Sequence, residues 1–173
     1  MLFRSLHTAL KKTYNLKAEI KWPNDVLING KKLAGILVET SWVGDKAKGI
    51  VLGMGINIRP NAVPPIAELN FPATSLEDAL EKPIDRIEIL HGILTALMKW
   101  RPLLGSGEMV AAWEKNLAFY GKQVEVTQGD GKVIHGKILG INSDGSLRLD
   151  TLKSLLFGDV HLRPMRVSYI RKK

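Results

Sequence analysis

Residues 26–38 have the sequence VLINGKKLAGILV, and this stretch decides the fold. Its Asn29-Gly30 pair supplies the positive-φ residues that a tight two-residue turn requires, and an apolar run stands on each side of the pair. The pattern therefore predicts a β-hairpin whose strands are residues 26–28 and 33–42.

The segments around the hairpin extend this prediction in both directions. A second turn at Gly44-Asp45 leads to another apolar run, residues 49–58, so we expect a meander of at least three strands. Residues 18–22 alternate polar and apolar, which predicts a strand that ends at Pro23. Residues 2–14 carry leucines at helical spacing, which predicts an amphipathic helix at the start of the chain.

Helices are predicted between the meander and Tyr120. Residues 60–72 form a proline-bearing loop without periodicity. Residues 74–78 resemble a capped helix start, and Pro83 fits the first turn of a second helix that runs to about Trp100. We expect one face of that helix to carry five apolar residues, namely Ile84, Ile87, Leu90, Leu94 and Leu97.

The composition changes after Tyr120, where short alternating runs are separated by glycine-containing turns. Such runs predict a small β-barrel. We therefore expect two domains, residues 1–119 and 120–173, in an α+β protein whose first domain is a truncated mixed or antiparallel sheet with helices.

The composition also excludes several classes of function. The 173 residues include no cysteine, which excludes disulfides, thiolate metal sites and a cysteine nucleophile. Neither a membrane span nor a signal peptide is visible, so we expect a soluble, cytoplasmic protein. The net charge of +8 permits binding of nucleotides, nucleic acid or an acidic partner, but an aromatic content of 6% predicts no base-stacking platform.

Residues 21–25, Lys-Trp-Pro-Asn-Asp, place an amine, an amide and a carboxylate at one turn after a strand. Lys21 suits phosphate oxygens, Asn24 can pair with a nucleobase edge, and Asp25 can hold a Mg²⁺ ion that bridges phosphates. Equally, Pro, Asn and Asp favour turns for purely local reasons. The residues alone leave both interpretations open.

Lys32 begins the second strand of the hairpin. Alternation places Lys32 and Ala34 on one face and Gly35 on the other. The lysine either extends its charge into solvent or aims it into a pocket in which Gly35 lets a ligand lie against the backbone. Residues 53–57, Gly-Met-Gly-Ile-Asn, lie inside a strand, where two glycines indicate a bulge or a close ligand and Asn57 needs a polar partner.

The order and spacing of these motifs resemble the second half of the catalytic domain of biotin protein ligases. The resemblance rests on residues 21–25, 32–35, 53–57 and 73–76, and on residues 140–147 and 158–163 of the C-terminal region. It implies a class II synthetase-like half domain followed by an SH3-like barrel. The family's glycine- and arginine-rich loop and its winged helix lie upstream of these motifs, so we expect an incomplete or split chain.

The resemblance also implies a reaction. Biotin and Mg-ATP would give biotinyl-5′-adenylate, and the biotinyl group would then pass to a lysine of a carboxylase carrier domain. Lys32 matches the family's catalytic lysine. Of the other matching positions, Lys21 would support the phosphates, Asn24 and Asn57 would contact the adenylate, Asp25 would bind Mg²⁺, Gly35 would border biotin, and Arg163 would reach toward the nucleotide.

The partners expected from the resemblance are a biotin carboxyl carrier domain and either a second copy of the chain or a complementary N-terminal fragment. We expect no membrane partner and no DNA partner. Two alternatives stay open: a lipoate-type protein ligase, and a non-catalytic module that binds adenylate, a carrier protein or nucleic acid.

Overall fold

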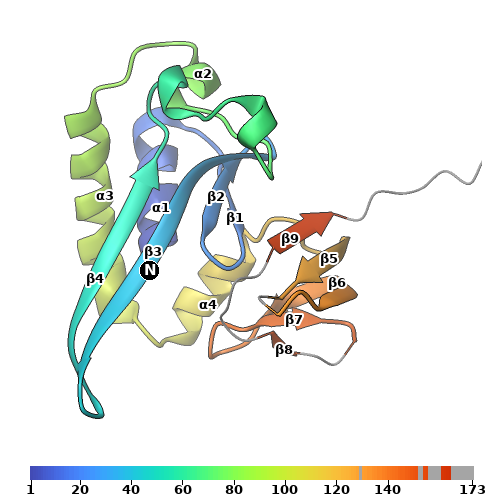
Figure 1. Ribbon diagram of the computed structural model, residues 1–173. Helices are drawn as coiled ribbons and strands as arrows, with labels where there is room; N and C mark the ends of the chain where they lie inside the picture. The colour runs from blue at the N-terminus through green and yellow to red at the C-terminus, as the bar shows by residue number, and fades with distance from the viewer. Residues whose placement is uncertain (129, 152–153, 156–160, 165–173) are drawn as a thin grey trace, which may run out of the picture. The chain divides into compact units, whose positions relative to one another are not determined.

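The computed structural model describes residues 1–128, 130–151, 154–155 and 161–164. The chain divides into two compact units, Met1–Ala118 and Phe119–Lys173. Each unit has its own sheet, and both sheets are antiparallel (Figure 1).

The first sheet confirms the predicted meander. Its strands are β1 (Glu19–Lys21), β2 (Asp25–Ile28), β3 (Lys31–Val43) and β4 (Lys46–Ile56), paired in that order. The turn between β2 and β3 has Asn29 and Gly30 at φ 49° and 73°, the left-handed conformations that a two-residue hairpin needs. Among the described strands, β4 pairs with β3 alone, so β4 is an edge strand of this sheet.

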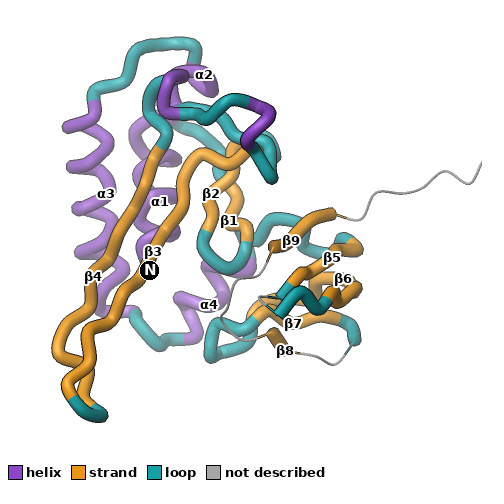
Figure 2. The backbone as a smooth tube through the Cα atoms, viewed as in Figure 1, coloured by secondary structure: helices purple, strands orange, loops and turns teal. Residues whose placement is uncertain are grey.

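Two helices, α1 (Leu2–Tyr14) and α3 (Arg86–Trp100), lie side by side and supply much of the core (Figures 1 and 2). Leu6 and Leu10 of α1 are fully buried in one cluster with Val26 of β2 and Ile93 of α3. Each such side chain contributes about 1.5–3 kcal/mol when it is removed from water. A Cβ on Gly92 would lie 3.3 Å from Ala9 Cβ, so glycine allows the two helices to approach closely.

Only part of the predicted apolar face of α3 packs: Ile84, just before the helix, is buried, and Leu97 packs against the core. Ile87, Leu90 and Leu94 are 71%, 49% and 50% exposed, whereas the buried residues of the helix are Ile89, Ile93, Ala96 and Trp100. The helix carries apolar residues on two sides, and contact with α1 at Gly92 selects one of them. The helix also begins at Arg86 with Asp85 as its N-cap, so Pro83 precedes the helix and is not in its first turn.

The remaining segments of the first unit are short. α2 (Leu76–Leu80) is capped by Ser75, whose hydroxyl accepts a hydrogen bond from the backbone N–H of Asp78 at 3.1 Å. The proline-bearing loop contains two single 3₁₀ turns, η1 (Pro60–Ala62) and η2 (Ile66–Glu68). A third, η3 (Arg101–Leu103), links α3 to α4 (Gly107–Glu114). Ile20 of β1 bonds through its backbone to Asn116 and Ala118, which ties the end of this unit to its sheet.

The second unit contains β5 (Gln123–Thr127), β6 (Val133–Ile141), β7 (Leu147–Leu149), β8 (Ser154–Leu155) and β9 (His161–Pro164). The strands form one sheet in the order β8-β7-β6-β5-β9, with alternating residues of β5 and β6 buried. Among the residues that the structure describes, no pairing joins β8 to β9, so closure into a barrel stays a prediction. In the described part of the chain no helix is long and apolar enough to cross a membrane.

Candidate functional site

A row of chemically distinctive residues crosses the first sheet. The register pairs Lys21 with Asp25, Asp25 with Gly35, and Gly35 with Gly55. Residues directly opposite each other on neighbouring strands share a face of the sheet. The row therefore runs from two charged side chains on β1 and β2 to two glycines on β3 and β4.

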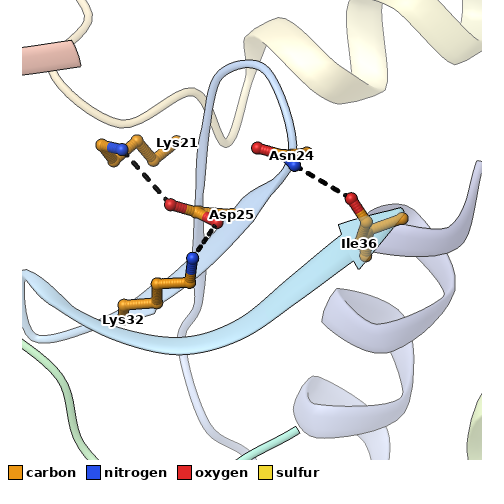
Figure 3. A network of polar contacts seen from close by, with 5 residues as sticks. All are labelled: Lys21, Asn24, Asp25, Lys32 and Ile36. Atoms are coloured by element: carbon orange, nitrogen blue, oxygen red, sulfur yellow. Dashed lines mark hydrogen bonds and ion pairs between the residues drawn. The ribbon is translucent and has the colours of Figure 1, made fainter. Parts of the chain in front are cut away.

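The charged end of the row is an ion-pair network (Figure 3). Asp25 Oδ2 lies 3.2 Å from Lys21 Nζ, and Asp25 Oδ1 lies 2.7 Å from Lys32 Nζ. The side chains of Lys21 and Asp25 are 8% and 10% exposed, whereas that of Lys32 is 41% exposed. The network thus has a buried pair at its base and one accessible ammonium group at its tip.

Lys32 belongs to the face of Gly35, and the alternation argument that separated them was wrong. Val26 pairs with Ala34 and Leu27 pairs with Lys32, which leaves Leu33 as an extra residue in β3. This β-bulge shifts the side-chain alternation by one position and re-aims Lys32. As a result, Lys32 Nζ lies 3.4 Å from the point where a Cβ of Gly35 would be.

The loop before α2 is fastened to Lys32 through the backbone. The Lys32 N–H donates to the carbonyl of Pro72 at 2.7 Å, and the Thr74 N–H donates to the carbonyl of Lys32 at 2.9 Å. The same loop places the ring of Phe71 with its centroid 5.0 Å from Lys21 Nζ. That separation is within the range of a cation–π contact, so Phe71 covers the buried lysine.

Asn24 and Asn57 both use their side-chain amides within the fold. Asn24 Nδ2 donates to the carbonyl of Ile36 at 3.0 Å, and Asn57 Nδ2 donates to the carbonyl of Thr74 at 3.2 Å. Asn24 thus fixes the turn after β1 to β3 (Figure 3), while Asn57 holds the loop that carries Phe71. Their predicted contacts with an adenylate stay predictions.

A shallow cavity of about 380 Å³ opens beside the glycine end of the row. It is lined by Asn24, Gly35, Ile36, Leu37, Gly53, Met54 and Gly55. Apart from Asn24, the lining residues are glycines and apolar side chains, so the cavity suits a flat or apolar group. Together with the lysines at the other end, this face suits a molecule that has one anionic end.

A protein-held magnesium ion does not fit the residues present. Mg²⁺ needs near-octahedral oxygen coordination, but both oxygens of Asp25 face ammonium groups. In the part of the chain that the structure describes, no group of three His, Cys, Asp or Glu side chains could hold a metal ion. The geometry therefore gives no support to the predicted role of Asp25.

Two features of the site were missed by reasoning from the sequence. Phe71 stands in a loop without periodicity. The signal that could have drawn attention to it is its place two residues before Ala73, which begins the segment 73–76 that resembles the family. Gly55 was noted as a glycine in a strand, but its position opposite Gly35 depends on strand register. Arg163 lies in β9 opposite Glu125 in the second unit, and its predicted reach toward a nucleotide stays a prediction.

Comparison with known sequences identifies both parts of the chain. Residues 2–57 match the Biotin/lipoate A/B protein ligase family, and residues 119–163 match the Biotin protein ligase C terminal domain. The bifunctional ligase/repressor BirA of Bacillus subtilis is 34% identical over 161 residues, which are 88% of this chain and 49% of that protein. The biotin–[acetyl-CoA-carboxylase] ligase of Paracoccus denitrificans is 32% identical over 142 residues, 75% of this chain and 55% of the relative.

Solved structures agree with this relationship. The apo biotin protein ligase of Aquifex aeolicus superposes with a TM-score of 0.82 at 28% identity, over 95% of this chain and 73% of that one. The same enzyme in complex with biotin and ATP gives a TM-score of 0.80 at 29% identity, over 95% of this chain and 69% of that one. The chain spans about half the length of the curated relatives that it matches. Through its residues 2–57 and 119–163, the chain belongs to the biotin protein ligase family.

Proposed function

We propose that the row from Lys21 to Gly55 is the part of a biotin protein ligase site that brings biotin and ATP together. The observation that carries this proposal is the accessible ammonium group of Lys32, which an ion pair of 2.7 Å holds beside Gly35. An ammonium group there lies between the charged end of the row and the cavity over its glycines. Its position suits a reaction in which a carboxylate must approach a phosphate.

The proposed reaction has two steps. A carboxylate oxygen of biotin attacks the α-phosphorus of ATP, and pyrophosphate leaves with the electron pair of the broken P–O bond. A lysine amine of a carrier domain then attacks the acyl carbon, loses a proton and displaces AMP. In the first step two anions must meet, and the ammonium group of Lys32 offsets their repulsion and the charge that develops on the phosphate.

The other residues of the site have supporting roles in this proposal. Lys21, which is buried beneath Phe71, adds positive charge under the phosphates. Gly35 keeps the sheet surface flat where the biotin end of the adenylate would lie. Asn24 and Asn57 each use one N–H of Nδ2 within the fold, and the other N–H and Oδ1 are the groups that each would present to the adenylate. A role of Arg163 toward the nucleotide is part of the same proposal and rests on the family resemblance.

Biotin-dependent exchange of radiolabelled pyrophosphate into ATP tests the proposal directly, because exchange needs only the first step. We expect exchange with biotin and Mg-ATP, its loss in Lys32→Ala, and retention in the neighbouring variant Lys31→Ala. Exchange supported by lipoate in place of biotin would identify a lipoate-type ligase. A folded chain without exchange for either acid would leave a non-catalytic module that binds adenylate or carrier protein.

We further propose that β4 receives another polypeptide. The β3–β4 hairpin exposes large apolar side chains on both faces, among them Trp42 at 63%, Ile50 at 63% and Val51 at 64%. No other strand that the structure describes pairs with the second edge of β4. Exposed edges of this kind favour strand addition. The polypeptide that pairs with β4 would be a second copy of the chain or a complementary N-terminal fragment. Separately, we propose a biotin carboxyl carrier domain as the acceptor of the biotinyl group and the cytoplasm as the location of the protein. A monomeric mass by light scattering at high concentration, alone and with the fragment, would refute the strand addition.

A further inference from the structure

We propose that Asp25 is a positioning residue that gathers the ammonium groups of Lys21 and Lys32 at one point, and that it is not a metal ligand. This inference rests on the proposed function, because it assigns a role within the same site. It departs from the sequence-based expectation that Asp25 binds Mg²⁺.

The carboxylate of Asp25 is divided between two cations. Oδ1 is 2.7 Å from Lys32 Nζ, and Oδ2 is 3.2 Å from Lys21 Nζ, so each oxygen has its own ammonium partner. Two ammonium groups repel each other unless a negative charge stands between them. Asp25 therefore lets both lysines occupy the same part of the sheet face.

The network is one negative charge short of neutral. Two lysines against one carboxylate leave a net charge of +1, and two of the three side chains are at most 10% exposed. A buried charge is costly until it is compensated, so this arrangement attracts an anion. A metal cation placed on Asp25 would instead face both ammonium groups and would have to displace at least one of them.

The two lysines differ in their freedom to leave Asp25. Lys21 is paired with the carboxylate, and its Nζ also lies over the Phe71 ring, 5.0 Å from the centroid. Lys32 is 41% exposed, and its ammonium group lies beside Gly35, which lines the shallow cavity. An arriving anion can therefore draw the Lys32 ammonium group toward itself while Lys21 continues to neutralise Asp25. In this way Asp25 sets the starting position of the catalytic lysine.

The test compares Asp25→Asn and Asp25→Glu with the wild-type chain and with Asp45→Asn, which alters an exposed carboxylate in the β3–β4 turn. Mn²⁺ binding to the nucleotide-free chain is measured by electron paramagnetic resonance. The ¹⁵N signals of the lysine ammonium groups are recorded by NMR and assigned with Lys21→Met and Lys32→Met. We expect no Mn²⁺ site that depends on Asp25, and we expect the Lys21 and Lys32 signals to shift in both Asp25 variants but not in Asp45→Asn.

Two results would overturn the inference: a Mn²⁺ site in the wild type that is lost in Asp25→Asn, or Lys21 and Lys32 signals that ignore both Asp25 variants. Asp25→Glu keeps the charge, so it decides the question if Asp25→Asn fails to fold. In pyrophosphate exchange, Asp25→Glu should lower the rate about 100-fold, which is the effect of misplacing a reacting group by about 1 Å. The Mg²⁺ concentration that the exchange requires should stay the same. Absence of exchange in the wild type would refute the proposed function, while the Mn²⁺ and NMR results would still decide the role of Asp25.

Discussion

The charge count at Asp25 makes an asymmetric prediction about stability. Replacing Asp25 with Asn leaves two ammonium groups without a carboxylate, and one of them belongs to a side chain that is only 8% exposed. Removing one partner of a buried pair costs about 3–5 kcal/mol. We expect about 3 kcal/mol for Asp25→Asn, because Phe71 still contacts Lys21 and because Lys32 can turn to solvent.

Replacing either lysine should cost far less. Lys21→Met leaves a neutral pair between Asp25 and Lys32, and Lys32→Met leaves one between Asp25 and Lys21. Loss of a buried partner is costly when it leaves a buried charge uncompensated. Because Asp25 keeps one ammonium partner in each lysine variant, we expect changes within about 1 kcal/mol for each. The same charge count thus predicts one large effect and two small ones from a single network.

Urea denaturation followed by tryptophan fluorescence measures these differences, since Trp22 is fully buried in the turn that joins β1 to β2. With a slope of about 2 kcal/mol per molar urea, Asp25→Asn should lower the midpoint by about 1.5 M. Asp45→Asn, on the exposed hairpin turn, is the matched control and should leave the midpoint unchanged. Equal losses in Asp25→Asn and Lys21→Met would refute the reasoning, because the network would then act as separate pairs and not as one shared carboxylate.

Three further predictions concern catalysis, packing and pH. Lys32→Met should lower pyrophosphate exchange about 10²–10³-fold with little loss of stability, and equal loss in the neighbouring Lys31→Met would remove Lys32 from its assigned role. Gly92→Val should destabilise the chain by about 1–3 kcal/mol, because even a Cβ there would lie 3.3 Å from both Ala9 Cβ and Thr13 Oγ1. Calorimetry measures the loss, and the control is Gly107→Ala, whose Cβ would have no atom within 4 Å. Burial, followed by the charge of Arg4, lowers the pKa of His7 from 6.5 to about 4. The unfolded chain therefore binds the extra proton between these values, and stability should fall as the pH drops from about 6.5 to 4. His7→Gln should flatten that slope in denaturation curves, and an unchanged slope would contradict the assignment.

Local signals account for the parts of the fold that the sequence predicted well. The Asn29-Gly30 turn has one suitable backbone conformation, and the leucines of α1 lie on one side of a helix that has charges elsewhere. The orientation of α3 was not predictable in this way, because both of its sides are apolar. Only the close approach of Gly92 to α1, a contact between residues far apart in sequence, distinguishes the buried side from the exposed one.

The candidate site shows the same division between local and long-range information. The residue types of Lys21, Asp25 and Lys32 were visible as motifs, but alternation alone placed Lys32 on the wrong face. A bulge depends on which residues of two strands pair, and the fully buried side chain of Leu33 fixes that choice by packing with the helices. The core therefore helps to orient the lysine that we propose as catalytic: burying Leu33 as an extra residue turns Lys32 toward Asp25 and Gly35. A chain with regular alternation at this point would keep all three motif residues and yet separate the ammonium group from the carboxylate that positions it.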